Sequence, residues 1–269
     1  MVCKNCQNPL LEADDYCNKC GAKVIRNRLT IGNLFEHISE TFLNYDNKLL
    51  RTFIALFTKP DDVIGGYING VRKKYVNPIS YLGLALTLGG LSIFIMNKFF
   101  PESLDFSGMT IEGQEEQLKN TMYYLQEYYT LYMVIFVPIY ALMSRVVFLK
   151  RKDFNYTEHI VFFMFIFAQL TLFSLCTNII AGLLKIPGMY VGYYNIIIQV
   201  IYTAYCLKQL YKLSIQGIIL RTLLFFGILL SSMLLIMIIG FITVLVFKDT
   251  EVVKSFLEAQ KTAQETKGG

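Results

Sequence analysis

Long uncharged stretches alternate with short charged connections along most of the chain. The clearest stretch is residues 160–184, which contain no Asp, Glu, Lys, Arg or His. A helix needs about 20 apolar residues to cross the hydrocarbon core of a bilayer. Five windows of this kind occur, at residues 75–97, 128–144, 160–184, 186–207 and 222–247. The pattern predicts an all-α polytopic membrane protein with about five transmembrane helices in a domain over residues 75–247, followed by a short tail at 248–269.

Residues 29–74 show a different pattern, in which apolar residues recur at steps of three and four. These residues are Ile31, Leu34, Phe35, Ile38, Phe42, Tyr45, Leu49, Phe53 and Phe57. A single apolar stripe at this spacing predicts an amphipathic helix. Such a helix can lie flat in the membrane interface, or it can pack against the spans or the N-terminal segment. The residues that follow it predict a second, juxtamembrane helix, which Thr58 caps and Gly70 ends.

Four of the six cysteines lie within the first twenty residues, as two Cys-x-x-Cys pairs. Cys3 and Cys6 form the first pair, and Cys17 and Cys20 form the second. Two such pairs at short separation predict a structural zinc ribbon over residues 1–25, with four thiolate ligands to Zn2+ and no open position for a catalytic water. Disulfides and a redox function are the alternatives. The reducing cytosol argues against the first, and the lack of a βαβ pattern argues against the second.

The residues that follow the two cysteine pairs differ, and the remaining cysteines stand alone. Gly21 suits the chain reversal after the second pair because it has no Cβ, whereas Gln7 occupies the equivalent place after the first pair. Cys176 and Cys206 lie in apolar runs, and we interpret them as small buried hydrophobic residues.

Basic residues mark alternate connections between the predicted spans. Arg72, Lys73 and Lys74 precede the first span, and further cations follow the second and the fourth. By contrast, residues 98–127 contain two cations and six acids. Cytosolic loops are enriched in Lys and Arg, so the pattern predicts a cytosolic N-terminus and an external C-terminus, in the inner membrane of the cell. We interpret the three cations before the first span as topology and membrane-surface residues.

Few residues in the sequence suggest chemistry. Glu158 and His159 stand at the predicted cytosolic start of the third span, where ionisable groups are functional candidates; the alternative is that Glu158 caps the helix and His159 packs at the interface. Uncharged polar residues that could line a solute path are Gln169, Asn178, Asn195, Gln199 and Thr203. Gly83, Gly89 and Gly90 are small residues that permit close contact between the first span and another helix, and they could equally line a path. The sequence contains no HExxH, P-loop or GxSxG motif.

Two stretches carry longer motifs: residues 58–78, with TKPDDVI and YINGVRKKYVNP, and residues 155–162, NYTEHIVF. They resemble the patterns P-x-x-V-I-x-x-Y-x-x-G-x-R-x-x-Y-x-N-P and Y-x-E-H-x-V-F of an uncharacterised bacterial membrane family with an N-terminal zinc ribbon, a domain of unknown function. Val71 stands where that family usually has Lys. The resemblance covers most of the chain and implies no particular activity. The predicted architecture is also similar to that of Yip-type five-span membrane proteins, which implies a membrane-organising or partner-binding role.

These observations favour a non-enzymatic scaffold or partner-binding membrane protein. Only 17% of the residues are charged, against about 25% in an ordinary soluble domain, and the dispersed net charge of +5 does not favour nucleic acid. The expected partners are the lipid bilayer, a cytosolic protein and a second copy of the chain. The alternative function is a small-solute transporter or channel. A third hypothesis is an intramembrane enzyme that uses Glu158 and His159.

Overall fold

The computed structural model describes residues 1–22, 24, 48–101 and 115–246. The chain divides into two compact units, Met1–Asn47 and Lys48–Gly269, and each is described by itself. Residues 25–47, which include much of the predicted amphipathic helix, lie outside the described residues, as does the predicted tail.

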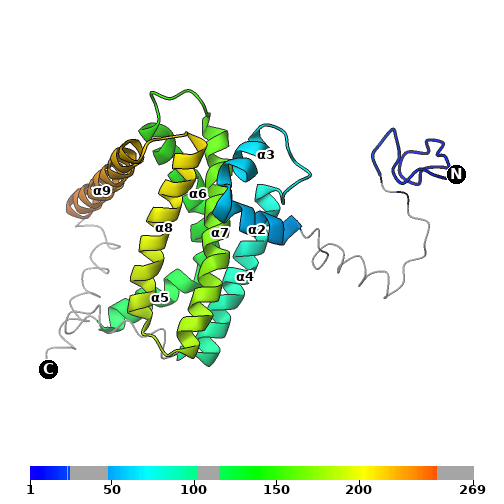
Figure 1. The fold of residues 1–269 in the computed structure, drawn as a ribbon. Helices are drawn as coiled ribbons and strands as arrows, with labels where there is room; N and C mark the ends of the chain where they lie inside the picture. The colour runs from blue at the N-terminus through cyan, green and yellow to red at the C-terminus, as the bar shows by residue number, and fades with distance from the viewer. Residues whose placement is uncertain (23, 25–47, 102–114, 247–269) are drawn as a thin grey trace. The chain divides into compact units, whose positions relative to one another are not determined.

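The second unit consists of helices over its described residues (Figure 1). In chain order they are α2 (Lys48–Thr58), the π-helix η1 (Asp61–Gly65), α3 (Gly66–Ile68), α4 (Pro78–Phe99), α5 (Glu115–Glu127), α6 (Tyr129–Val147), α7 (Tyr156–Leu183), α8 (Gly188–Leu210) and α9 (Ile215–Val246). The all-α prediction is therefore confirmed. The acidic connection after the first predicted span is partly helical, because it contains α5.

Four of the described helices are long and apolar enough to cross a membrane. They are α4, α6, α7 and the part of α9 from Ile215–Gly240, with mean hydropathies of 1.9, 1.8, 2.2 and 2.7. The helix α8 takes the place of the predicted fourth span and has 23 residues, but it is not among these four. Its tyrosines, together with Asn195 and Gln199, make it less apolar. The chain thus has the helices of a membrane protein. Among the predicted spans, α8 is long enough to cross a bilayer but is less apolar than the four helices named above.

The helix α7 is central to the second unit (Figure 1). The helices α4 and α6 pack along α7, α8 returns beside it after a short turn, and α9 packs on α6 and α8. The α6–α7 and α8–α9 connections meet at one end, where the Arg151 guanidinium donates to the Tyr211 carbonyl at 3.3 Å. The α7–α8 turn lies at the opposite end. Connections that are rich in basic residues therefore share one end of the unit.

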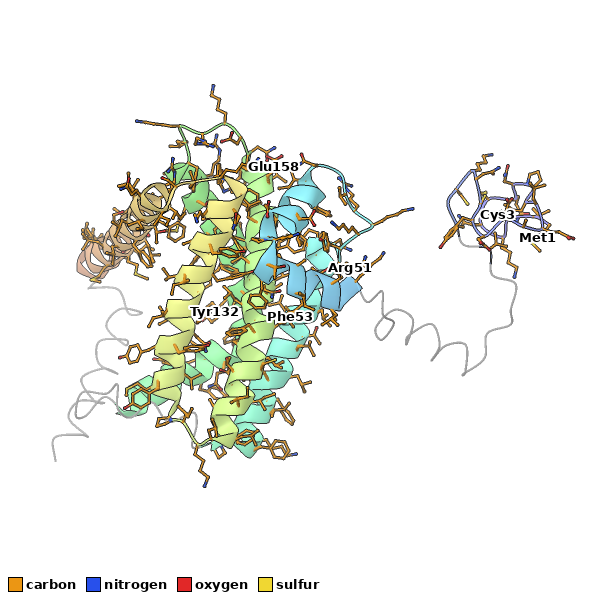
Figure 2. The ribbon with its side chains drawn as sticks, in the orientation of Figure 1. Met1, Cys3, Arg51, Phe53, Tyr132 and Glu158 are labelled. Atoms are coloured by element: carbon orange, nitrogen blue, oxygen red, sulfur yellow. The ribbon has the colours of Figure 1, made fainter. Side chains whose placement is uncertain are left out.

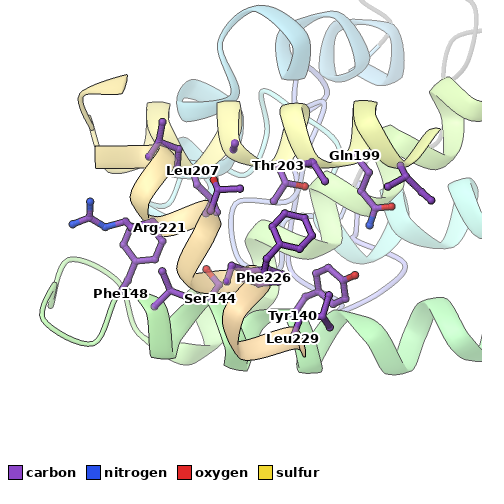
Figure 3. Close-up of a pocket in the computed structure, with 16 residues that line it drawn as sticks. Tyr140, Ser144, Phe148, Gln199, Thr203, Leu207, Arg221, Phe226 and Leu229 are labelled. Carbon is purple, nitrogen blue, oxygen red and sulfur yellow. The ribbon is translucent and has the colours of Figure 1, made fainter. Parts of the chain in front are cut away.

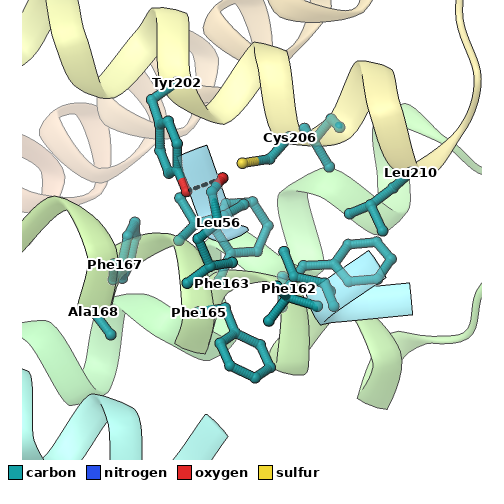
Figure 4. Packing of buried hydrophobic residues seen from close by; sticks show 14 of the residues in the cluster. Leu56, Phe162, Phe163, Phe165, Phe167, Ala168, Tyr202, Cys206 and Leu210 are labelled. Atoms are coloured by element: carbon teal, nitrogen blue, oxygen red, sulfur yellow. Dashed lines mark hydrogen bonds between the residues drawn. The ribbon is translucent and has the colours of Figure 1, made fainter. Parts of the chain in front are cut away.

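An aromatic core joins α7 to its neighbours (Figure 4). Phe162, Phe163 and Phe165 of α7 are fully buried, and Cys206 of α8 packs among them. Residues 63–64 of η1 are also fully buried in this core. The short η1 segment is thus anchored by burial against the long helices, because five residues form too little helix to be stable alone.

The described part of the amphipathic stretch, α2, packs against the long helices. The Gln169 side chain of α7 donates to the Phe53 carbonyl at 3.0 Å, and the Tyr202 hydroxyl of α8 donates to the Leu56 carbonyl at 3.1 Å (Figure 4). The Leu56 carbonyl would normally accept from the residue four positions on, but that residue is Pro60, which has no N–H. Tyr202 therefore supplies a bond that the helix itself lacks, and of the two expected placements α2 takes the packed one.

The prediction that Thr58 is the N-cap of the juxtamembrane helix is wrong. Thr58 is the last residue of α2, and its hydroxyl donates backward to the Ile54 carbonyl at 3.2 Å. The next helix begins at Asp61 without a side-chain cap. Gly70 ends the segment as predicted: its φ is +94°, and its N–H donates to the Tyr67 carbonyl. A hydroxyl near a helix end can bond backward as well as forward, and the sequence pattern does not distinguish the two.

Close contact between the first span and another helix occurs at Gly89. A Cβ there would lie 2.9 Å from Thr171 of α7 and 3.0 Å from Tyr129 of α6. At Gly83 and Gly90, a Cβ would meet no described atom within 4 Å. Close contact is thus found at Gly89 and, among the described residues, not at the other two glycines.

We expect Gly89→Ala to destabilise the helix bundle by about 1–3 kcal/mol, because the added methyl group overpacks a filled interface. Gly90→Ala is the matched control, since it adds the same methyl group to the same helix without a clash and should be neutral or stabilising by up to about 1 kcal/mol. Thermal unfolding of the two purified variants in detergent checks this. Equal melting midpoints would show that α4 and α7 are not in the contact described.

Candidate functional site

The two Cys-x-x-Cys turns at the N-terminus have the same backbone form. The Gln7 N–H donates to the Cys3 carbonyl at 2.9 Å, and the Gly21 N–H donates to the Cys17 carbonyl at 2.8 Å. Gln7 has a φ of +60° and Gly21 a φ of +70°, so both lie in the left-handed region. Gln7 is therefore equivalent to Gly21 in conformation, and its side chain adds a strain of about 1–2 kcal/mol.

These turns bring four thiol sulfurs together. The Cys3 sulfur lies 3.7 Å from that of Cys20, the Cys6 sulfur lies 3.6 Å from that of Cys17, and all four lie within 4.8 Å of one another. Four sulfurs bound at about 2.3 Å from a tetrahedral ion would be about 3.8 Å apart, whereas disulfide sulfurs are bonded at about 2.05 Å. All four cysteines are free. The arrangement fits a metal ion and contradicts the disulfide alternative.

The pKa values of the cluster thiols are shifted in different directions by hydrogen bonds and burial. The Asn5 side chain and then the Ala22 backbone lower the pKa of the Cys20 thiol to about 6. The Asn8 backbone lowers the pKa of Cys6, but the Cys20 sulfur and burial outweigh it and raise that pKa to about 12. Metals bind the thiolate form, so hydrogen bonds that lower the pKa of a cluster thiol favour metal binding. The prediction that the two lone cysteines are buried is confirmed for Cys206 and wrong for Cys176, which is exposed on α7.

Glu158 and His159 have different surroundings although they are neighbours in sequence. Glu158 lies at the start of α7 (Figure 2) and forms a capping box with Asn155. The Glu158 carboxylate accepts from the Asn155 N–H, and the Glu158 N–H donates to the Asn155 side chain at 3.0 Å. The interpretation of Glu158 as a helix cap is therefore confirmed.

His159 is fully buried and connects three helical elements. Its Nδ1 lies 3.0 Å from the Ser144 Oγ on α6, and its Nε2 lies 2.9 Å from the Tyr211 hydroxyl just after α8. Phe148 stacks on Tyr211, with ring centroids 4.0 Å apart. A serine and a histidine at this distance could form a nucleophile and a base, but both side chains are 0% exposed. The arrangement is a structural bridge between α6, α7 and the end of α8. No local sequence pattern indicated that Ser144 and Tyr211 belong to it.

The three cations before α4 do not have the same surroundings. The Lys74 Nζ lies 2.6 Å from the Asp62 carboxylate across the η1–α4 connection. Arg72 and Lys73 are exposed, and the Arg72 guanidinium lies 5.5 Å over the ring of Tyr67 in α3. Lys74 therefore closes this connection through an ion pair. The membrane-surface role of the three cations stays a prediction.

Lowering the pH is expected to loosen the connection that Lys74 closes. Hydrogen bonds from Lys74 and then Tyr75 hold the pKa of the Asp62 carboxyl below its usual value. A pKa that is lower in the folded state stabilises the fold above the unfolded-state pKa of about 4, and this contribution is lost as the pH falls through the folded-state pKa. The loss is small because both side chains are partly exposed and solvent screens the pair.

Hydrogen exchange over residues 61–76 at pH 7 and pH 3 measures this effect. After correction for intrinsic rates, the wild-type segment should lose protection at pH 3. The Asp62→Asn variant, which lacks the titrating group, should show little difference between the two values. An equal loss of protection in both proteins would contradict the assignment to Asp62.

Two cavities adjoin α8. One, of about 220 Å³, lies between α6, α8 and α9 and is lined by Gln199 and Thr203 among others (Figure 3). The other, of about 440 Å³, lies among α6, α7 and α8 and is lined by Asn178, Asn195 and again Gln199. Four of the five predicted path residues thus line a cavity. The fifth, Gln169, is fully buried and hydrogen-bonded to neighbouring helices.

None of the curated proteins and none of the solved structures matches this chain. A family model does match residues 46–89, which contain α2, η1, α3, the basic connection and the first half of α4. Within that segment, the longer sequence motif covers the buried residues of η1 and the ion pair between Asp62 and Lys74. The matching family is described as a protein of unknown function, DUF3667, which agrees with the predicted resemblance to a domain of unknown function over this part of the chain.

Proposed function

We propose that this protein is a non-enzymatic membrane protein that binds a cytosolic partner protein through a zinc-loaded N-terminal ribbon. The cluster of Cys3, Cys6, Cys17 and Cys20 carries the proposal, because four sulfurs complete the coordination of Zn2+ and leave no position for a substrate. In this proposal Zn2+ holds a short segment in one shape, and that shape is the recognition surface. The apolar helices would anchor the chain that carries the ribbon in the bilayer.

The proposed orientation places the N-terminus in the cytosol and the C-terminus outside, in the inner membrane. The shared end of the α6–α7 and α8–α9 connections supports it, because positive residues are retained on the cytosolic side. The orientation requires α8 to cross the bilayer, and its length and position beside α7 support that. Compartment-specific reporters fused to each terminus should report opposite sides. Reporters on the same side would overturn the orientation.

Capture experiments with the full chain in lipid nanodiscs test the partner-binding function. The wild-type chain should retain a specific cytosolic protein, and the Cys17→Ser variant should lose it. Cys176→Ser is the matched control, since it removes an exposed thiol outside the cluster and should keep the partner. Identical captured proteins for Cys17→Ser and wild type would argue against the ribbon as the binding surface.

The cavity of about 440 Å³ favours small-solute transport as a second candidate function. Tyr129 and Thr171 are hydrogen-bonded at 3.1 Å on its wall, and Asn178 and Asn195 lie across the α7–α8 pair. Such groups could replace part of the hydration of a polar solute. Liposomes that contain the protein should release polar solutes faster than empty ones, and Asn195→Leu should remove the difference. Unchanged flux in that variant would exclude this route.

A further inference from the structure

The cavity between α6, α8 and α9 has one charged end and an apolar body. Figure 3 shows Arg221 and Phe148 at one end, with Gln199 and Tyr140 toward the other. Most of its other lining side chains are apolar, and none of the described lining residues is Asp or Glu. The cavity therefore offers a cation and a hydrophobic groove to the same ligand.

Arg221 is held at the charged end without an anionic partner among the described residues. Its guanidinium donates to the Gly217 carbonyl at 3.0 Å and lies 5.1 Å over the Phe148 ring. No described carboxylate lies within 4.0 Å of it. Arg145 is close by, since it donates to the Phe148 carbonyl at 3.3 Å. A guanidinium carries five donors in a planar fork that matches a phosphate group, so the charge and the donors of this end suit a phosphate.

The position and length of the groove suit a lipid. The charged end lies beside the end of α6, where Phe148 is the C-cap, and in the first part of α9, which contains Arg221. Lipid headgroups lie beside the ends of spanning helices. From there the lining follows α8 from residue 207 back to residue 196, a distance of about 16 Å along a helix. One leaflet has a hydrocarbon thickness of about 15 Å. Ile196 at the far end is 60% exposed, so the groove opens to the surroundings.

We propose that this groove binds one anionic membrane lipid, with its headgroup phosphate against Arg221 and an acyl chain along α6 and α8. A zwitterionic lipid such as phosphatidylcholine would fill the apolar body, but its choline cation offsets the phosphate charge, so it would pair with the guanidinium more weakly. A soluble anion would pair with the guanidinium but would gain nothing from the apolar lining. The lipid site uses no residue of the N-terminal ribbon. The lipid proposal and the partner-binding proposal can therefore be tested independently.

The chain has no Trp, so one introduced Trp can report which lipid occupies the groove. The reporter is the Phe226→Trp variant, because Phe226 lines the groove (Figure 3), reconstituted in phosphatidylcholine vesicles. Brominated phosphatidylglycerol and brominated phosphatidylcholine are then compared as quenchers. A single cation is worth about 1 kcal/mol toward anionic lipid, so phosphatidylglycerol should bind about five-fold more tightly. The Ile239→Trp variant, in an exposed part of α9, should show no such preference.

Variants in the Phe226→Trp background test each half of the site. Arg221→Gln should abolish the preference for phosphatidylglycerol, and Arg221→Lys should keep it because the charge remains. Lys212→Gln, in the same connection but outside the lining, is the matched control and should also keep it. Ala204→Phe fills the groove and should reduce quenching by both lipids.

Three outcomes would overturn the proposal. The first is an equal preference at the two Trp reporters, and the second is a preference that survives Arg221→Gln. The third is protection of the groove reporter from both brominated lipids, which would show that another helix or a second copy of the chain covers the groove.

Discussion

Cys17→Ser is expected to leave the N-terminal unit without bound metal and without its fold. The described residues of this unit form only a small core, of Cys3, Leu10 and Cys17, and two of those three side chains belong to the four-sulfur cluster. In small zinc-binding segments the free energy of metal binding, roughly 10–16 kcal/mol at neutral pH, is the folding free energy. Elemental analysis of the purified full chain should fall from roughly one zinc ion per chain to near zero. Limited proteolysis should then cut within residues 1–22.

Cys176→Ser and a chelator complete this test. Cys176 is exposed on α7 and lies outside the four-sulfur cluster, so its replacement should change neither the metal content nor the proteolysis pattern. A strong chelator applied to the wild type should reproduce the Cys17→Ser pattern, and added Zn2+ should reverse it. Retention of metal by Cys17→Ser, or an intact unit after chelation, would show that the fold does not depend on these sulfurs.

His159→Ala is expected to destabilise the second unit by about 3 kcal/mol, because it leaves a cavity and removes two hydrogen bonds between buried groups. Ser144 and Tyr211 would each lose the partner described above. A loss of this size corresponds to a melting midpoint lower by roughly 6–12 °C. Thermal unfolding of the detergent-solubilised protein, followed by loss of the monodisperse species, provides the measurement.

The neighbour of His159 supplies the control. Glu158→Gln keeps a residue that can complete the capping box, so its midpoint should stay close to that of the wild type. Tyr211→Phe removes one hydroxyl and should cost about 1 kcal/mol. In the double variant with His159→Ala the two losses should be less than additive, because both break the same contact. An unchanged midpoint in His159→Ala would mean that the bridge does not hold the helices together, and would return His159 to the functional candidates.

Residues 160–184 show how far the sequence alone can be taken. An uncharged run of that length has to be helical in a bilayer, because only a helix satisfies its backbone polar groups internally, and α7 covers Tyr156–Leu183. The cysteine spacing is informative for a related reason, since two short turns bring four sulfurs together with little help from the rest of the chain. The window at 186–207 differs in composition from the other four, because tyrosines lower the hydropathy of α8 while still suiting a membrane interface.

Contacts between distant segments could not be predicted in this way. The bond from Gln169 to the Phe53 carbonyl joins residues 116 positions apart, and the bond between Tyr211 and His159 joins residues 52 positions apart. Hydrophobic periodicity tells which face of a helix is buried, but not which side chain of another helix it meets. Arg221 illustrates the limit: as one cation in a basic connection it suggested orientation alone, and its place on a cavity wall depends on how α9 packs on α6 and α8.

The amino-acid sequence by itself determined that this chain is helical, that several of its helices suit a bilayer and that four N-terminal thiols can share a metal ion, because each of these properties depends on residues close together in the chain. Only the tertiary structure decided that His159 is a buried bridge, that α2 docks on α7 and α8 and that Arg221 closes one end of a groove, because packing between helices chooses partners that lie far apart in sequence.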